Sequence, residues 1–545
     1  MPADITVDVL CAGSGAGGCA AALVAAELGL EPLLVEKGDL LGGATAYSYG
    51  GLWAGKTHVA ARAGFEDSLD QAAAYMRFVA SGFELPENLA AYIEWAPRVL
   101  EAYEAMGLRF QVIPVPDHHY PHAPGSAPGG RTLEAEPVDE AELGQWQGQL
   151  VASPYLPRGV AWTDMVAWGG IGNTRNWPAH ELADPGRKRR YAAGQALVAQ
   201  LLRGLEQRHV RVLRRARVER LTSEGGAVTG AVVSVDGGEQ LIRARRGVVL
   251  ATGGYESNPT LARRLEGLPG FASMFPRTIE GDGLIAGSEL GAALYRVPVN
   301  LILMLGYMVP EAAAGEVFRA AAITEMAYPH TIVVNRGGRR FADESQFQNM
   351  APVVHQFDDR THQYRNLPCF LIFDSQFAAT YSFAGAPDGT AIPEWVAREH
   401  SWGALADRLG LDAAQLESTV SGFNQAAARG DDPEFGRGSS RWANASAGDM
   451  SHQPNPNLGP LDTPPYYGLE LRPTCQSSAG LLTNELGQVM HLRGQPIAGL
   501  YGCGNVTAPT HFGSGYQAGF TLMGSLTFAY RAVQHAAGAR PHAER

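Results

Sequence analysis

The stretch VDVLCAGSGAGGCAAALVAAELGLEPLLVEKGDLLGGATAYSYGGLWAG, residues 7–55, decides the fold of this chain. It begins with a short apolar run of strand type at residues 7–12 and passes through a glycine loop into a stretch rich in Ala and Leu at residues 20–30. A second apolar run follows at residues 31–35. The apolar spacing predicts a strand, a turn, a helix and a second strand in that order, which is the start of an α/β fold.

The glycines of the loop have the spacing GxGxxG, and each position has a physical reason to be glycine. Gly13 allows a tight bend, Gly15 lets a pyrophosphate approach the backbone, and Gly18 lets the helix pack closely on the strand. The first amides of the helix then face the phosphates. Glu36 ends the second strand, where its carboxylate can accept hydrogen bonds from an adenosine ribose. The pattern predicts a dinucleotide site for an unphosphorylated ribose; the alternative is a merely structural turn.

The length and charge of the chain agree with those of an enzyme that binds a dinucleotide. The chain has 545 residues, of which 45% are hydrophobic and 18% are charged, so it can bury a large core and should form two or three domains. The 43 Lys and Arg residues are outnumbered by 55 Asp and Glu residues, which gives a net charge of −12. Because no basic surface dominates, nucleic acid is not an expected partner. The one basic cluster, GRKRR at residues 186–190, is interpreted as a solvated loop.

The cysteine pattern and the N-terminal residues predict where in the cell the protein is found. The five cysteines contain no CxxC pair and no spacing typical of metal ligands, so we expect thiols in a reducing environment and no metal site. Residues 5–12 are needed for the first strand, which leaves no room for a cleaved signal peptide. No apolar run reaches the ~18 residues of a membrane span. We therefore expect a soluble cytoplasmic protein.

Capping and turn residues predict further elements along the chain. Ser68 and Gln71 form a capping box that opens a helix reaching about Val79. Residues 111–190 are rich in Pro, Gly and Trp with poor periodicity, and a loop region of that length is usually functional or wraps the surface. The remaining expected elements are helices at residues 86–106 and 193–208 and a strand pair with glycine turns at residues 225–226 and 237–238.

Four later stretches share their order with one protein superfamily. VVLATGGYESN, at residues 248–258, is a buried strand that runs into Ala-Thr-Gly-Gly. The others are TIEGDGLIAGSELGAAL at residues 278–294, VVNRGGRRFADES at residues 333–345 and GLYGCGN at residues 499–505. With the glycine loop and Glu36, they resemble the fumarate reductase and succinate dehydrogenase flavoprotein superfamily over nearly the whole chain. The resemblance implies that the dinucleotide is FAD rather than NAD.

The same resemblance implies which residues bind FAD. Val218 would contact adenine through its backbone, and Ser48 and Gly50 lie in a loop on the flavin side, where tight packing alone is the alternative. Succinate dehydrogenase subunits attach FAD through a histidine, and residues 38–55 contain none, so FAD is expected to be noncovalent. The expected cofactor-binding residues are Gly13, Gly15, Ala16, Gly17, Glu36, Lys37, Gly43, Ala44, Ser48, Gly50, Val218, Ala251, Thr252, Gly253 and Asn505.

Within that superfamily, three stretches look like parts of the 3-ketosteroid dehydrogenases. They are GGATAYSYGGLWAG at residues 42–55, DSLDQAAAYMRFVA at residues 67–80 and PDHHYPHAPG at residues 116–125. The implied fold is a Rossmann-like FAD-binding domain of the glutathione-reductase type, residues 1–283 and 456–545, with an inserted α+β catalytic domain at residues 284–455. The flavin would lie at their interface, where a cleft can close over a small hydrophobic ketone.

The implied chemistry removes two hydrogens from adjacent carbons beside a ketone. It requires a base for the acidic α-proton, an acceptor for the β-hydride and donors that hold the developing enolate oxygen. Flavin N5 accepts the hydride, so the protein must supply orientation, proton transfer and polarisation of the carbonyl. A tyrosine suits the last two roles, because its phenol can donate to an oxyanion and, with a lowered pKa, can give up its proton.

Tyr120 and Tyr516 are the first candidates for this phenol. Tyr120 precedes a proline, as does the active-site tyrosine of the ketosteroid dehydrogenases. One alternative is that Tyr120 is only a surface tyrosine. Another is that His118 or His119 is the base. Tyr516, in HFGSGYQAGF, is one residue out of step with the tyrosine of those enzymes. Gly519 falls where the family uses a backbone amide on the substrate carbonyl.

Gln348 departs from both families. It stands four residues after Glu344, where fumarate reductases carry a proton-delivering arginine and ketosteroid dehydrogenases carry the tyrosine that removes a proton. An amide can do neither at neutral pH. No arginine lies between Arg493 and Arg531, where fumarate reductases place one over the substrate, so a clamp for a dicarboxylate is not expected.

The missing base leaves several hypotheses open. It could have moved to Tyr120, Tyr466 or Tyr467, although the last two could equally be core aromatics. The substrate could need no strong base, or the enzyme could be an ene-reductase in which tyrosine protonates the α-carbon. A flavoprotein subunit without catalysis of its own is the least favoured alternative. We favour an FAD-dependent dehydrogenase that desaturates a cyclic ketone or 3-ketosteroid and passes its electrons to an unidentified acceptor.

Overall fold

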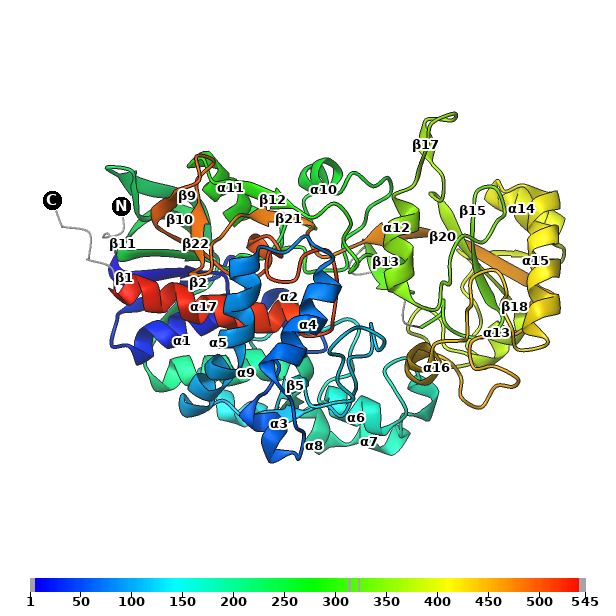
Figure 1. The fold of residues 1–545 in the computed structure, drawn as a ribbon, viewed down its shortest axis with the longest axis horizontal. Coiled ribbons are helices and arrows are strands. Elements are labelled where there is room, and N and C mark those ends of the chain that lie inside the picture. Colours follow the sequence, from blue (N-terminus) through cyan, green and yellow to red (C-terminus); the bar gives the residue numbers. More distant parts are fainter. Residues whose placement is uncertain (1–4, 312–314, 322–323, 539–545) are drawn as a thin grey trace.

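The chain folds into two lobes (Figure 1). The structure is a computed structural model that describes residues 5–311, 315–321 and 324–538. The first lobe contains the N-terminal strands, in blue, and the C-terminal helix, in red. The second lobe contains a separate sheet whose strands lie between residues 304 and 474. The chain thus leaves the first lobe once and returns to it.

A mainly parallel sheet forms the centre of the first lobe. Its strands are β1 (Ile5–Ala12), β2 (Pro32–Val35), β8 (Arg211–Leu213), β9 (Ala216–Glu224), β10 (Ala227–Val235), β11 (Gly238–Leu250), β22 (Gln488–Met490) and β23 (Pro496–Gly502). The order β8-β2-β1-β11-β23 is parallel throughout, whereas β22 is antiparallel to β23. Strands β9 and β10 extend β11 as an antiparallel meander. The predicted first two strands and the predicted strand pair are confirmed.

The predicted helices of the first lobe are also confirmed. Its longer helices are α1 (Ala16–Glu27), α4 (Leu69–Ala80), α5 (Pro86–Ala105), α9 (Ala193–Gln207), α10 (Pro259–Glu266), α11 (Asp282–Glu289) and α17 (Phe520–Gly538). Ser68 caps α4 as expected, because its Oγ accepts a hydrogen bond of 3.2 Å from the Gln71 amide. In Figure 1, α17 lies beside α1 and α5.

Strand β1 buries side chains on both of its faces. Val9 and Cys11 lie in one core with α1, α5, α9 and α17. Leu10 and Ala12 lie in a second core with the β9–β10 meander and α11. Burial on both faces is typical of a parallel strand in an α/β protein. In such a sheet, ligands bind in the crevice outside the carboxyl ends of the strands.

The stretch at residues 111–190 contains many short elements rather than one long loop. Strand β5 pairs with both β3 and β4, and β6 pairs with β7. These pairings anchor the stretch against the first lobe. The elements of the stretch are β4 (Phe110–Val112), β5 (Thr132–Ala135), β6 (Val138–Asp139), β7 (Arg190–Tyr191), α6 (Trp162–Ala167), α7 (Ala179–Ala183) and α8 (Pro185–Lys188), and their partner β3 (Leu52–Trp53) lies earlier in the chain.

An antiparallel sheet forms the second lobe. Its strands are β13 (Met304–Glu311), β14 (Gly315–Ala320), β15 (Thr331–Asn335), β18 (Cys369–Asp374), β19 (Ala397–Glu399) and β20 (Tyr466–Thr474). The order is β14-β13-β20-β18-β15, with β19 also paired to β20. Helices α14 (Trp402–Leu409) and α15 (Ala413–Ala427), in yellow in Figure 1, cover the face that carries Ile332 and Ile372. Val333 and Leu371 face a different core.

Strand β20 bears on where the second lobe ends. It pairs with β13, β18 and β19, and therefore belongs to the second sheet. The expected boundary at residue 456 would assign this strand to the first lobe instead. The antiparallel pair of β12 (Leu294–Arg296) and β21 (Ala479–Leu481) marks the place where the chain leaves and re-enters the first lobe.

Three further features concern cysteines, membranes and metals. All five cysteines are free and buried. In the described part of the chain, no helix has the length and apolar character needed to cross a membrane. Among the same residues, no group of three or more His, Cys, Asp or Glu side chains is placed to hold a metal ion.

A buried ionic cluster stabilises the second lobe. Arg340 donates hydrogen bonds of 2.9 Å to Glu344 and to Asp432, and Arg437 donates one of 2.9 Å to Glu344. None of the four residues is more than 5% exposed. Burial alone would raise the pKa of Glu344, but the two guanidinium charges outweigh it and hold that pKa below its ordinary value. The cluster joins the segment after β15 to the chain near Asp432.

Replacing Glu344 with Gln should destabilise the protein strongly, because two buried guanidinium groups would lose their shared carboxylate. Breaking a buried ion pair costs roughly 3–5 kcal/mol. The matched control is Glu399→Gln, which removes an exposed partner of Arg408 at 3.2 Å and should cost less than about 1 kcal/mol. Urea unfolding followed by circular dichroism measures both, and equal midpoints for the two variants would contradict the assignment.

Candidate active site

One cavity connects the glycine loop with the junction of the two lobes. Its volume of about 440 Å³ lies within the ~300–1,000 Å³ usual for ligand sites. Every residue that the resemblance assigned to FAD lines it: Gly13, Gly15, Ala16, Gly17, Glu36, Lys37, Gly43, Ala44, Ser48, Gly50, Val218, Ala251, Thr252, Gly253 and Asn505. The structure thus brings the predicted cofactor residues together, while their individual roles stay predictions.

The turn after β1 requires glycine at two positions. Gly13 has a φ of +104°, and a Cβ there would lie 2.3 Å from the carbonyl oxygen of Ala251. A Cβ on Gly18 would lie 1.8 Å from the carbonyl oxygen of Gly13. Side chains cannot occupy either place, so the ends of β1 and β11 and the start of α1 meet backbone to backbone.

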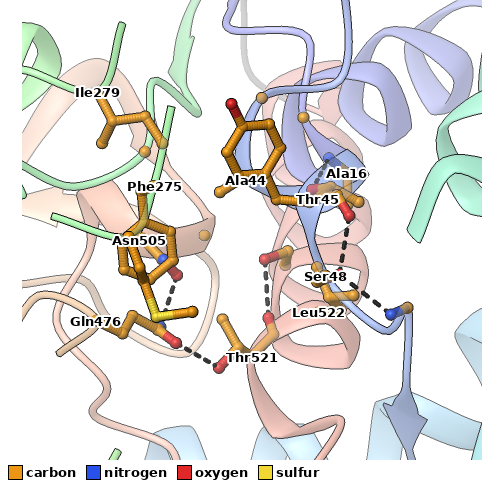
Figure 2. Close-up of a pocket in the computed structure, with 18 of the residues that line it drawn as sticks. Ala16, Ala44, Thr45, Ser48, Phe275, Ile279, Gln476, Asn505, Thr521 and Leu522 are labelled. Carbon is orange, nitrogen blue, oxygen red and sulfur yellow. Dashed lines mark hydrogen bonds between the residues drawn. The ribbon is translucent and has the colours of Figure 1, made fainter. Parts of the chain in front are cut away.

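The start of α1 fits a bound pyrophosphate. Gly15, its N-cap residue, makes no side-chain cap, and the first turn contains no acidic residue. A Cβ on Gly15 would have Thr45 Oγ1 as its nearest neighbour at 3.3 Å, beside the cavity. Thr45 Oγ1 also accepts a hydrogen bond of 3.0 Å from the Ala16 amide (Figure 2). A helix start whose N-cap residue is glycine lets a phosphate group approach the backbone closely.

Glu36 is held at the end of β2 by three hydrogen bonds. Its carboxylate accepts from the Ser14 amide at 2.9 Å, from the Ser14 hydroxyl at 2.6 Å and from the Gly38 amide at 2.7 Å. These donors fix the carboxylate at the cavity wall. The position fits the ribose-binding role that the sequence predicted.

Lys37 and Val218 lie beside this carboxylate at the cavity wall. The Lys37 ammonium pairs with Glu280 at 2.7 Å and with Asp282 at 2.8 Å. Lys37 therefore links the end of β2 to the start of α11. Val218 is buried in β9 and lines the cavity, and its contact with adenine stays a prediction.

A chain of amides and a hydroxyl crosses the flavin side of the cavity. Gln476 Nε2 donates to Asn505 Oδ1 at 2.7 Å, and Thr521 Oγ1 donates to Gln476 Oε1 at 3.1 Å (Figure 2). Asn300 Nδ2 donates a hydrogen bond of 2.5 Å to the backbone carbonyl oxygen of Gln476. Of these, only Asn505 was predicted.

The flavin-side loop is fixed by short-range bonds. Ser48 Oγ donates to the Thr45 carbonyl at 2.8 Å and accepts from the Gly50 amide at 3.1 Å (Figure 2). A Cβ on Gly50, whose φ is +76°, would lie 2.4 Å from the Ala193 backbone. Tight packing against α9 therefore accounts for Gly50, while Ser48 and Gly50 both line the cavity.

Tyr516 and Gly519 line the cavity at the junction of the lobes. The Tyr516 ring lies 5.0 Å from His119 and 5.8 Å from Phe347, measured between ring centroids. Burial raises the pKa of Tyr516 to about 12, so its phenol is protonated at neutral pH and can donate. Gly519 has a φ of +102°, and its carbonyl accepts from the Trp53 amide at 3.2 Å.

Tyr120 lies near this group but does not belong to the cavity lining. Its hydroxyl is buried and has no hydrogen-bond partner among the described residues. Burial raises the pKa of Tyr120 to about 12, although the backbone of Tyr516 acts in the opposite direction. An orphaned buried hydroxyl costs free energy and calls for an explanation. The backbone of Tyr516 lies close enough to this hydroxyl to lower its pKa and is one such group.

Gln348 reaches this group from the second lobe. Its amide nitrogen contacts Nδ1 of His119, and the neighbouring Phe347 ring faces Tyr516. The predicted residues Tyr120, Tyr516 and Gln348 therefore gather around His119, which no prediction had placed at the centre. They come from three distant segments of the chain, so no local motif could show this arrangement.

The two histidines of the loop are poor bases. Burial lowers the pKa of His118 to about 4, and its ring stacks on Trp442 with centroids 3.9 Å apart. Burial and the neighbouring His118 hold the pKa of His119 well below its ordinary value. Both rings are therefore neutral at neutral pH and are weak proton acceptors.

A buried guanidinium anchors the loop that carries Tyr120. Arg131 donates to Asp67 at 2.6 Å, to Asp117 at 2.8 Å and to the Gly125 carbonyl at 2.7 Å. Asp117 also accepts from the Trp53 indole at 2.7 Å. The loop is thus fixed at both ends to the first lobe, which keeps Tyr120 near Tyr516.

Tyr466 and Tyr467 lie away from the cavity, on β20. The Tyr466 ring stacks on Trp402 with centroids 3.7 Å apart. The Tyr467 ring stacks on Phe373 at 5.1 Å. Both rings are packed among aromatic side chains of the second lobe, which favours the alternative that they are core residues.

The far wall of the cavity contains a cation that sequence reasoning missed. Arg319, on β14, lines the cavity together with Glu325 and Ser382. No arginine clamp for a dicarboxylate was expected, because no arginine lies between Arg493 and Arg531. The structure supplies an arginine from a different strand, and no motif around it gave a signal.

Comparison with known proteins agrees with this geometry. A family model described as an FAD binding domain matches residues 8–524. A 4-oxocyclohexanecarboxylate 2-dehydrogenase from Sinomonas cyclohexanicum is 34% identical, over 98% of this chain and 93% of that protein. A 3-oxosteroid 1-dehydrogenase from Mycobacterium tuberculosis is 33% identical, over 97% of this chain and 98% of that protein.

A solved structure extends the similarity to three dimensions. The crystal structure of 3-ketosteroid Δ1-dehydrogenase from Sterolibacterium denitrificans, in complex with 1,4-androstadiene-3,17-dione, matches with a TM-score of 0.86 and 30% sequence identity. The match covers 98% of this chain and 99% of that one, so it includes both lobes. The family match likewise extends from β1 into α17. The chain therefore belongs to the family of FAD-binding flavoproteins, as its motifs implied.

Proposed function

We propose that this protein is an FAD-dependent dehydrogenase that introduces a carbon–carbon double bond next to the carbonyl of a cyclic ketone or 3-ketosteroid. One observation carries the proposal: Tyr516 and Gly519 line the same cavity as the glycine loop of the FAD site. A ring held by these two residues would lie beside the flavin side of the cavity. The relatives named above act on ring ketones of both sizes, which supports this class of substrate.

The two-lobe architecture supports a division of roles between the lobes. We propose that the first lobe is a Rossmann-like FAD-binding domain of the glutathione-reductase type, and that the second lobe is an inserted α+β catalytic domain. The pairing of β20 favours an insertion that ends near Thr474 rather than at residue 455. FAD would be held without a covalent bond.

The reaction removes one hydrogen as a hydride and the other as a proton. FAD, when bound, supplies the acceptor for the hydride. Tyr516 is assigned to the ketone oxygen, because a phenol with a pKa of about 12 is a hydrogen-bond donor at neutral pH. The Gly519 backbone amide is assigned to the same oxygen. Together they would stabilise the negative charge that develops there as the α-proton leaves.

Tyr120 is assigned to the α-proton. Its buried hydroxyl has no partner among the described residues, and it lies close to the backbone of Tyr516. The neutral His119 and Gln348 would position the rings rather than exchange protons. By microscopic reversibility the same residues would serve an ene-reductase, and the names of the relatives favour desaturation.

Purified protein should be yellow, and Gly15→Val should abolish FAD binding because its side chain would enter the cavity beside the helix start. Glu36→Ala should weaken FAD binding through loss of the ribose acceptor. The control is Gly29→Asn, since nothing lies within 4 Å of a Cβ at that position. Absorbance at 450 nm measures loading, and acid precipitation should leave the flavin in the supernatant. Flavin retained in the pellet would contradict noncovalent binding.

Anaerobic addition of ring ketones should bleach the bound flavin, with formation of the conjugated enone detected in the ultraviolet. A panel from cyclohexanone through decalones to 3-ketosteroids tests ring size. Succinate should not bleach it, because succinate has no ketone for Tyr516 to polarise. Faster bleaching by succinate than by any ketone would overturn the proposed function.

Tyr120→Phe should lower the rate of flavin reduction by roughly 10²–10⁴-fold, and Tyr516→Phe by roughly 10²–10³-fold, with FAD content unchanged. The base works as the phenolate, and the pKa of Tyr120 is about 12, so the wild-type rate should rise with pH between about 7 and 10. Tyr120→Phe should lose that rise.

Gln348→Ala should cost less than either; a dead Gln348 variant beside two normal Tyr→Phe variants would place the chemistry in the second lobe.

A further inference from the structure

Helix α4 lies between the two parts of the chain that carry the tyrosines assigned to catalysis. On one side, the Phe78 ring of α4 lies 6.3 Å from the Tyr120 ring, measured between centroids. On the other side, the Ser514 amide, two residues before Tyr516, donates to the Ala80 carbonyl of α4 at 3.3 Å. The helix therefore contacts the loop that carries Tyr120 and the segment that carries Tyr516 at the same time.

Tyr75 is a fully buried residue of α4 whose hydroxyl lies between these two parts of the chain. The hydroxyl donates a hydrogen bond of 2.7 Å to Oε1 of Gln517, the residue that follows Tyr516. Burial raises the pKa of Tyr75, and the backbone of Tyr120 lies close enough to the hydroxyl to act in the opposite direction. One phenol is thus placed against both parts.

The ring of Tyr75 is held by Trp53, which connects the same two parts of the chain. The two rings stack with centroids 5.8 Å apart and an interplanar angle of 22°. The Trp53 indole donates to Asp117, in the loop that carries Tyr120, at 2.7 Å. The Trp53 amide donates to the Gly519 carbonyl at 3.2 Å. Because the stack fixes the ring, the Tyr75 hydroxyl keeps a fixed position relative to both parts.

The orientation of the Gln517 side chain depends on Tyr75. Gln517 is fully buried, and its Nε2 atom has no hydrogen-bond partner among the described residues. Its Oε1 atom accepts from the Tyr75 hydroxyl. Without that hydroxyl, both polar ends of the buried amide would be unpaired, which is costly enough to favour a shift of the side chain. A shift of Gln517 would displace its neighbour Tyr516, which lines the cavity.

We propose that Tyr75 is a positioning residue for the proton step, which holds Tyr120 at a fixed separation from Tyr516 and Gly519. This inference rests on the proposed function and adds to it a residue that does not line the cavity. Removal of the α-proton and polarisation of the ketone oxygen act on the same ring, so the base and the oxyanion donors need a fixed mutual geometry. Tyr75 itself keeps its proton, because burial raises its pKa above the ordinary value.

Tyr75→Phe removes the hydroxyl and keeps the ring that stacks on Trp53. The rate constant of anaerobic flavin reduction by a saturating ring ketone should fall roughly 10- to 100-fold, as expected for misplaced catalytic groups. The KM should stay near that of the wild type, because the donors act mainly on charge that develops in the transition state. FAD content, measured by flavin absorbance, should be unchanged.

The matched control is Tyr103→Phe, which makes the same substitution at another fully buried tyrosine. The Tyr103 hydroxyl donates to the Leu526 carbonyl at 3.3 Å, and neither residue lines the cavity. Tyr103→Phe should lower the unfolding midpoint about as much as Tyr75→Phe, since each loses one hydrogen bond of a buried phenol. Its rate of flavin reduction should stay near that of the wild type.

Gln517→Met, alone and combined with Tyr75→Phe, separates positioning from stability. The double variant replaces both partners of the hydrogen bond by apolar groups, which can be nearly neutral for stability. Its unfolding midpoint should therefore return towards that of the wild type, while its rate should stay as low as that of Tyr75→Phe. If Tyr75→Phe alone fails to fold or to keep FAD, the double variant serves for the same comparison with the wild type.

A double-mutant cycle with Tyr516→Phe shows whether Tyr75 acts through Tyr516. The combined loss of rate should be clearly smaller than the product of the two single losses, because the phenol that Tyr75 positions is already gone. Independent effects would multiply, since the free energies of unconnected sites add. Circular dichroism and flavin absorbance check that each variant is folded and loaded.

Each contrary outcome has a definite meaning. Tyr75→Phe that reduces its flavin as fast as Tyr103→Phe overturns the positioning role and leaves the proposed function standing. So does a double variant with Gln517→Met whose rate recovers together with its stability, and so does a cycle with Tyr516→Phe in which the losses multiply. If no ring ketone bleaches the flavin of the wild type, the proposed function itself fails and the positioning role fails with it.

Discussion

The close approach of Gly13 to the Ala251 carbonyl is the constraint on which the rest of the structure depends. It brings the end of β1 against the end of β11 with no side chain between them. The loops that follow both strands can then share one wall of the cavity. The same turn brings the start of α1 close to Glu36, the residue that follows β2. The cofactor residues are scattered over 490 positions, and this contact is what makes them neighbours.

The parts of the fold that were predictable are the local ones. The glycine loop, the capping of α4 by Ser68 and the turns of the β9–β11 meander each depend on residues a few positions apart. The end of the second lobe was not predictable in this way. Strand β20 has an ordinary strand pattern, and only its pairing with β13 and β18 shows which sheet it joins.

The same distinction applies to the candidate site. Residues that belong to motifs, such as Gly15 and Asn505, were found because the motif carries them. Gln476, His119 and Arg319 act through partners from distant segments, and nothing adjacent in sequence marks them. Arg319 also shows the limit of an argument from absence. One missing arginine position said nothing about an arginine on another strand.

The contact of Gln348 with His119 has a consequence for the order of events in a catalytic cycle. One partner belongs to the second lobe and the other to the loop that carries Tyr120. Parting of the lobes would break this contact and withdraw Phe347 from Tyr516. An open enzyme could then keep its flavin yet lack an assembled pocket. With the lobes apart, ligands could exchange but the residues proposed for catalysis would not be together. Ligand exchange and reaction would then have to alternate.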